Sequence, residues 1–110
     1  MEPQTLSSSI VQNFTPTRKS TSRKGDNGIV LVIGGSYIYH GAPILSSLAA
    51  LRCGTDLVYT SVPKINVSAT RSTSPNLIVI PLVDQKLTLG AVKKLVGALP
   101  RNLHSATIGM

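Results

Sequence analysis

The sequence contains no tryptophan, one phenylalanine, one cysteine and only four acidic residues among its 110 positions. A single cysteine excludes an internal disulfide and is compatible with a reducing compartment. Four carboxylates leave few candidates for a general base, and no His, Cys and Asp grouping has the spacing of a metal-ligand set. No apolar run is long enough to cross a bilayer, so we expect no membrane partner. Hydrophobic residues still make up 42% of the chain, which predicts one globular domain at most, with an aliphatic core.

The net charge is strongly positive, at +7 from eleven lysines and arginines. Such an excess raises the question of a nucleic-acid or membrane-surface partner. One basic patch comprises Arg18, Lys19, Arg23 and Lys24, and the other cations are dispersed along the chain. No aromatic residues alternate with them to form a platform for stacked bases. We therefore favour a solvated basic surface and expect no specific nucleic-acid partner.

The most informative stretch runs from Gly28 to Pro43. Its residues 29–33 are an unbroken aliphatic run, typical of a strand that is buried on both faces of a parallel sheet. Gly34 and Gly35 end the run and allow a sharp turn with the backbone close to a ligand. Gly41-Ala42-Pro43 has the composition of a helix start, because proline is tolerated in the first turn. The stretch predicts a strand, a glycine loop and an anion-attracting helix N-terminus at the carboxyl edge of a sheet.

Two phosphate-binding motifs do not match this loop. A P-loop requires Lys and then Ser or Thr after its second glycine, whereas Ala42 and Pro43 follow Gly41. A dinucleotide fingerprint requires G-x-G-x-x-G and an acidic residue at the end of the next strand, and the spacing here is wrong. Taken alone, the glycine pair predicts a tight turn.

The rest of the chain alternates strands with helices. We expect strands over Asp56–Ser61, Leu77–Ile80 and Ser105–Ile108, helices over Ala42–Cys53 and Leu87–Leu99, and a short, less defined helix within Lys64–Thr73. Pro63 and Pro81 are expected to end the strands before them, and Gly54 is expected at the C′ position of the first helix. This alternation predicts an α/β fold with mainly parallel strands and right-handed crossovers.

Two segments need separate treatment. Residues 1–24 are rich in Ser, Thr and Gln, which fits an organellar transit peptide or a loose arm. We interpret 1–24 as a basic N-terminal arm and 25–110 as the domain.

In the helix after the glycine loop, Leu45, Leu48 and Ala49 share a wide apolar side, so we expect Ala49 to pack against the sheet.

The acidic residues are poorly placed for catalysis. Glu2 lies in the arm, Asp26 and Asp84 lie in turns, and Asp56 opens a strand at the end away from the ligand edge. None is a good general base, so we assign no catalytic residue and no metal site to this chain.

Several residues near the loop have two interpretations. His40 would titrate near neutrality within the loop, whereas His104 follows a helix and is expected at the surface. Ser36 is suited either to a phosphate contact or to closing its own turn. Tyr37 and Tyr39 are suited either to stacking on a ring or to covering the edge of the sheet.

A set of motifs in one register resembles a known family. They are Lys24-Gly25, Gly28, Val30–Ser36, Tyr39, Gly41-Ala42-Pro43, Ala49–Arg52, Gly54, Asp56–Val58 and Pro63, with Ser74–Val79 and Ile108-Gly109 further on. The GGS…YxGAP combination is the specific part. Together these residues resemble the ADP- or ATP-dependent NAD(P)H-hydrate dehydratases of the ribokinase-like superfamily, from about residue 16 to the end. Many members have His where this chain has Arg23.

This resemblance implies a three-layer α/β/α ribokinase-like fold and repair of a hydrated nicotinamide cofactor. ATP or ADP, with Mg²⁺, would phosphorylate the hydroxyl on the damaged ring, and elimination of phosphate would restore NAD(P)H. In the superfamily the catalytic aspartate and the main anion hole lie in a glycine-rich motif of the C-terminal half, which this chain does not contain. We therefore expect the chain to be the truncated N-terminal part of the domain, which supplies the substrate side.

The matching positions also imply a substrate site. By resemblance, Ala42 would contact the nicotinamide nucleotide, and the surrounding pocket would be shaped by Gly34, Gly35, Ser36, Tyr39 and Gly41. Alternative interpretations are a sugar or vitamin kinase of the same superfamily and a non-catalytic nucleotide-binding fragment. We expect a small-molecule nucleotide as partner, a cytoplasmic location, and homo-oligomers because a partial sheet leaves an unpaired strand edge.

Overall fold

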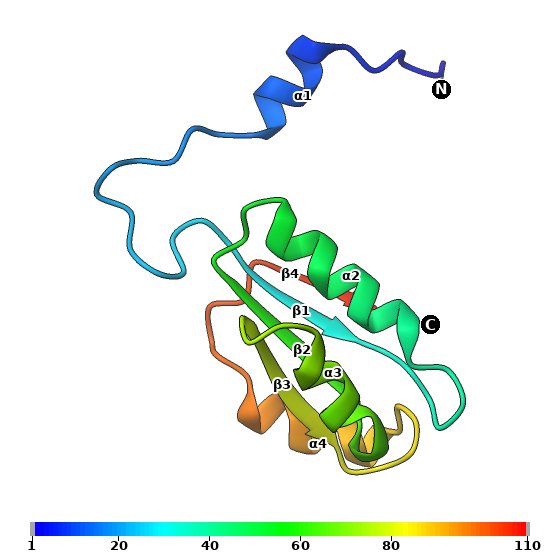
Figure 1. Ribbon diagram of the computed structural model, residues 1–110. Helices are drawn as coiled ribbons and strands as arrows, with labels where there is room; N and C mark the ends of the chain where they lie inside the picture. Colours follow the sequence, from blue (N-terminus) through cyan, green and yellow to red (C-terminus); the bar gives the residue numbers. More distant parts are fainter. Residues whose placement is uncertain (1, 110) are drawn as a thin grey trace.

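The computed structural model describes residues 2–109, which form a four-stranded parallel sheet with helices on both faces (Figure 1). The strands are β1 (Ile29–Ile33), β2 (Leu57–Pro63), β3 (Leu77–Leu82) and β4 (Ser105–Ile108). Their order in the sheet is β3-β2-β1-β4. Val30 pairs with Val58 on one side and with Ser105 on the other, so β1 is a central strand as its aliphatic run predicts.

The sheet lies between two layers of helices, which gives the three-layer α/β/α arrangement that the resemblance implied, and the N-terminal helix lies outside these layers (Figure 1). The helices are α1 (Ser8–Phe14), α2 (Gly41–Arg52), the 3₁₀ turn η1 (Lys64–Asn66), α3 (Val67–Thr73) and α4 (Leu89–Ala98). Figure 1 shows α2 and α3 on one face of the sheet and α4 on the other. None of these helices, within residues 2–109, is long and apolar enough to span a membrane.

The alternating side chains of the strands form one apolar cluster on each face. Beneath α2 and α3 lie Val32, Val58, Val62, Leu77 and Val79. Beneath α4, the side chains of Leu31, Ile33 and Leu82 pack with Ala91 and Leu95. The expected helix over 87–99 is thus confirmed in its central turns, and Thr88 caps it by accepting the N–H of Ala91.

The two prolines that were expected to end strands have different outcomes. β2 ends at Pro63, as expected, whereas β3 passes through Pro81 to Leu82. Pro81 faces Val62 in the register, and β3 has no neighbour on its other side among the described residues. Proline is tolerated on such an edge strand because its missing N–H can face away from the ladder. The sequence alone does not show that β3 is an edge.

The expected contact face of α2 was wrong. The helix buries Pro43 and Ser47, while Ala49 is exposed and Leu45 is 70% exposed. The turn after the helix follows the prediction, with Gly54 at φ +93°. Leu45 and Ala49 therefore face outward, and Ala50 and Leu51 are the apolar residues of the helix that pack against the sheet.

The N-terminal arm contains one helix and contacts the domain. It contains α1, a helix that buries no residue and begins with the cap of Ser7 on the N–H of Ile10. Figure 1 shows α1 well separated from the sheet. Further along the arm, Arg18 forms an ion pair with Asp56, just before β2. This contact holds the arm against the amino-terminal ends of the strands.

Candidate functional site

The buried glycine pair lies where β1 ends, at the carboxyl edge of the sheet. Gly34 donates its N–H to the carbonyl of Ser61 in β2 at 3.1 Å. Gly35 has φ +85°, and a Cβ placed there would lie 3.2 Å from the carbonyl oxygen of Tyr39 and 3.4 Å from Cγ of Pro43. A side chain at this position would meet both the left-handed backbone conformation and a crowded space. The turn therefore requires glycine at position 35.

A small turn follows between Ser36 and Tyr39. The N–H of Ser36 donates to the carbonyl of Tyr39 at 2.7 Å, and the N–H of Tyr39 donates to Oγ of Ser36 at 3.2 Å. The Ser36 hydroxyl thus closes its own turn, which was one of its two interpretations. Tyr37 and Tyr39 are 60% and 73% exposed, so both rings present most of their surface to solvent.

The turn leads directly into the N-terminus of α2. His40 stands at the N-cap and makes no side-chain hydrogen bond to the first turn. Gly41 and Ala42 are exposed, whereas Pro43 is buried and anchors the helix. The first-turn N–H groups of a helix have no partner within the helix and carry a partial positive charge. This helix start is an open surface suited to an anionic ligand that passes close to small side chains.

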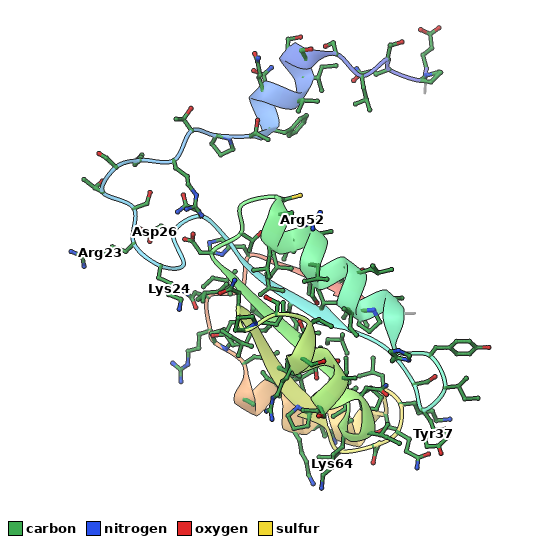
Figure 2. The ribbon with its side chains drawn as sticks, viewed as in Figure 1. Arg23, Lys24, Asp26, Tyr37, Arg52 and Lys64 are labelled. Atoms are coloured by element: carbon green, nitrogen blue, oxygen red, sulfur yellow. The ribbon has the colours of Figure 1, made fainter. Side chains whose placement is uncertain are left out.

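A shallow depression of about 370 Å³ lies beside the loop, at the carboxyl ends of β2 and β3. It is lined by Pro63, Lys64, Ile65, Val83, Asp84 and Gln85. Pro63 also borders the loop, because its Cδ lies 3.6 Å from the position of a Gly35 Cβ. Figure 2 shows Tyr37 and Lys64 at this same end of the molecule. The loop and the depression therefore lie at the same edge of the sheet, and both border Pro63.

A larger hollow of about 1160 Å³ lies between the arm and the opposite edge of the sheet. Its lining includes Arg18, Lys24, Asp26 and His104, and Figure 2 places Lys24 and Asp26 at that end. Ligands of open α/β sheets bind outside the carboxyl ends of the strands, not the amino ends. We therefore place the candidate site at the glycine loop. His104 is exposed as expected, and its Nδ1 accepts the N–H of Ile29 at 3.0 Å.

The acidic groups do not gather at the site. Asp56 lies at the amino end of β2, where the N–H of Asn27 is the main cause that lowers the pKa of its carboxyl below the usual value. Asp84 reaches the carboxyl edge, but its carboxylate accepts a hydrogen bond from Thr88. Among residues 2–109, no group of three His, Cys, Asp or Glu side chains is arranged to hold a metal ion.

All six residues that the resemblance assigned to the substrate lie within one short segment, the Gly34–Ala42 loop and helix start. The sequence reasoning did not identify two supporting contacts. Nδ2 of Asn66 donates to the carbonyl of Ser36 at 2.8 Å, and Ser47 and Thr60 form a buried hydroxyl pair at 2.7 Å. No local pattern signals either contact, because the partners are 30 and 13 residues apart.

A parallel sheet between helix layers, with a glycine loop at its carboxyl edge, defines an open α/β/α domain whose ligand edge is the carboxyl end of the strands. Comparison with known families gives the particular family. The profile of the NAD(P)H-hydrate dehydratases matches residues 30–99, which is more than half of the chain. The chain belongs to this family.

Proteins with assigned names include close relatives. The ADP-dependent (S)-NAD(P)H-hydrate dehydratase of Nitrosopumilus maritimus is 78% identical over all 110 residues, which correspond to 38% of its own length. The ATP-dependent (S)-NAD(P)H-hydrate dehydratase of Danio rerio is 37% identical over 100 residues, 91% of this chain and 29% of that protein. The chain thus spans well under half the length of these relatives.

Solved structures confirm the fold. A hypothetical protein from Streptococcus mutans superposes with a TM-score of 0.70 at 28% identity, covering 86% of this chain and 33% of the other. A ribokinase-like superfamily protein from Enterococcus faecalis gives a TM-score of 0.69 at 23% identity, covering 91% of this chain and 43% of the other. The ribokinase-like α/β/α architecture is therefore shown.

Proposed function

We propose that the full-length protein carrying these residues converts hydrated NAD(P)H to NAD(P)H with ADP or ATP as phosphoryl donor. The observation that carries the proposal is the buried Gly34–Gly35 turn, which presents the exposed Gly41-Ala42 start of α2 at the carboxyl edge of the sheet. This surface lies within the residues that match the NAD(P)H-hydrate dehydratase family. The chain described here would supply the substrate side of the site.

The proposed reaction has two steps. The terminal phosphoryl group of the donor moves to the hydroxyl on the hydrated ring. Loss of that phosphate together with a ring proton then restores the double bond of NAD(P)H. No described residue is assigned to the proton transfer, since the acids of this chain lie away from the loop or are engaged with neighbours.

The assigned residues would bind and orient the substrate. Gly34 and Gly35 let the backbone approach the ligand, and the turn from Ser36 to Tyr39 shapes the pocket wall. Gly41 and Ala42 leave room for the nicotinamide portion. The partial positive charge of the α2 N-terminus favours the anionic groups of a nicotinamide nucleotide.

We propose ADP as the preferred donor, because the relative from Nitrosopumilus maritimus is named as ADP-dependent at 78% identity. The Danio rerio protein, at 37% identity, is named as ATP-dependent. Mg²⁺ would accompany the donor phosphates, as is usual for bound nucleotides. Because no group of three His, Cys, Asp or Glu side chains among residues 2–109 is arranged to hold it, we derive no step from the ion.

We also propose that the protein forms homo-oligomers and works in the cytoplasm. Support for association comes from apolar side chains on the outer side of α2 and its preceding loop, with Leu45 70% and Ile38 72% exposed. Side chains of this kind are usually covered when they cluster. The single cysteine, Cys53, is free and exposed, which is compatible with a reducing compartment.

The experiment is a turnover assay of the full-length protein. It is given hydrated NADPH with ADP or with ATP, and recovery of the reduced-nicotinamide absorbance is followed. We expect recovery that requires the donor and is faster with ADP. If the donor is consumed only with a sugar or a vitamin, the protein is instead a kinase of the superfamily. If neither reaction occurs, a catalytic role for the protein is contradicted.

A further inference from the structure

Asn66 connects two segments that border the candidate site. Its side chain is 7% exposed, and its Nδ2 donates a 2.8 Å hydrogen bond to the backbone carbonyl of Ser36. Ser36 belongs to the loop after β1, whereas Asn66 ends the η1 turn after β2. The bond therefore links the carboxyl ends of two neighbouring strands through an amide that is nearly removed from solvent.

The position of Asn66 makes this use of its side chain notable. Asn66 stands at the N-cap of α3, where asparagine commonly accepts a hydrogen bond from the first turn of the helix. Its side chain makes no such bond. The side chain instead reaches the glycine loop. The backbone carbonyl of Asn66 accepts a hydrogen bond from the Thr70 hydroxyl in the helix at 2.8 Å. Residues that forgo a local preference often do so at functional sites.

The carbonyl of Ser36 is a sensitive point of the loop. Two hydrogen bonds lock Ser36 to Tyr39, and His40 and the start of α2 follow at once. If Ser36 moves, the exposed residues Gly41 and Ala42 at the start of α2 are therefore expected to move with it. On the other side of Ser36, Gly34 donates its N–H to the carbonyl of Ser61 at 3.1 Å, so β2 holds the start of the loop.

We propose that Asn66 is a positioning residue for the hydrated nicotinamide substrate. It holds the Ser36 carbonyl so that the start of α2 is presented to the substrate in one orientation. This inference rests on the proposed function of the same site. It assigns no role to Asn66 in binding the phosphoryl donor.

The test compares two variants of the full-length protein. Asn66→Ala removes the bond to Ser36. Thr70→Val is the matched control, since it removes a buried hydrogen bond from the same turn of α3 and leaves the Asn66 amide in place. We expect Asn66→Ala to raise the KM for hydrated NADPH about tenfold, because the start of α2 is then no longer held in the orientation that binds the substrate. The KM for ADP should stay unchanged, and Thr70→Val should lower Tm without raising either KM.

Asn66→Asp sharpens the comparison. It keeps the shape of the side chain but replaces the donor with a carboxylate oxygen that faces a carbonyl. We expect a KM for hydrated NADPH at least as high as that of Asn66→Ala. Recovery of a normal KM with aspartate would show that shape alone matters and would overturn the role of the hydrogen bond.

Hydrogen exchange of the same proteins without substrate gives a second readout. The backbone amides of Ser36 and Tyr39 should exchange about tenfold faster in Asn66→Ala, and at the wild-type rate in Thr70→Val. Unchanged exchange in Asn66→Ala would overturn the positioning role. Faster exchange with an unchanged KM would overturn its link to the substrate. Absence of hydrate turnover in the wild type would instead contradict the proposed function and, with it, the substrate role of Asn66.

Discussion

The hydroxyl oxygens of Ser47 and Thr60 lie 2.7 Å apart, and both side chains are fully buried between α2 and β2. Ser47 also donates to the carbonyl of Pro43 at 2.7 Å. Because its proton goes to Pro43, the hydroxyl of Thr60 is the donor in the pair. Through Ser47 the contact thus links Pro43, in the first turn of α2, to Thr60 in the sheet.

We expect Ser47→Ala to lower the free energy of unfolding by about 1–3 kcal/mol, because it leaves a buried donor on Thr60 without a partner. The double variant Ser47→Ala/Thr60→Val should lose less unfolding free energy than the sum of the losses in the two single variants. Denaturant unfolding of the full-length protein measures both, with Ser68→Ala at an exposed position of α3 as the control. Additive costs would show that the two hydroxyls are not coupled.

Gly35 in the loop and Gly41 at the start of α2 should respond oppositely to alanine. Gly35→Ala places a Cβ 3.2 Å from a carbonyl oxygen at φ +85°, so we expect a loss of about 1–2 kcal/mol or more in unfolding free energy. Gly41 lies in the helix with nothing within 4 Å of its added Cβ. Gly41→Ala should therefore be neutral or stabilising by up to about 1 kcal/mol. Equal losses from both substitutions would contradict the described loop.

The arm contact should depend on pH through Asp56. Its Oδ2 accepts the N–H groups of Asn27 at 2.9 Å and Gly25 at 3.0 Å, and Arg18 pairs with the other oxygen. The Asn27 N–H is the main cause of the lowered pKa. The stability that this carboxylate contributes is fully present above the usual aspartate pKa and is lost as the pH falls through the lowered value.

NMR titration of the Gly25 and Asn27 amides checks this dependence. Their shifts should follow one acid transition with a midpoint below the usual aspartate value, and Asp56→Asn should abolish it. A midpoint at or above the usual value would show that the carboxylate does not receive these hydrogen bonds in solution.

The sheet was predictable because its strands carry continuous local signals. The aliphatic run of 29–33 and the segments 57–61, 77–80 and 105–108 all form strands, in parallel. Local composition could not tell which strand is an edge, so Pro81 was wrongly expected to end β3. It also did not predict α1, a seven-residue helix that buries none of its residues.

The candidate site was predictable only along one segment. The glycine pair and Gly41-Ala42-Pro43 specify a turn and a helix start through backbone constraints, and the loop forms as expected. The supporting contacts of Asn66 and Ser47 depend on tertiary pairing, which leaves no periodic pattern in the sequence. The same limit explains the error at Ala49, because the helix buries Ser47 through a polar contact where an apolar face was expected.

The substrate side of the site is tested most directly by Ala42→Leu in the full-length protein. Ala42 is exposed at the start of α2, so a larger side chain should leave the fold intact while it fills the space proposed for the nicotinamide portion. Ala49→Leu is the control, since Ala49 is exposed on the same helix two turns further on.

The decisive measurement is the pair of KM values, for hydrated NADPH and for ADP, in Ala42→Leu. We predict that the KM for hydrated NADPH rises at least tenfold. A rise of this size is what a steric clash of about 1–3 kcal/mol would cause. The KM for ADP and the Tm should stay unchanged, and Ala49→Leu should resemble the wild type throughout. An unchanged KM for the hydrate, or a raised KM for ADP alone, would contradict the assignment of this loop to the substrate.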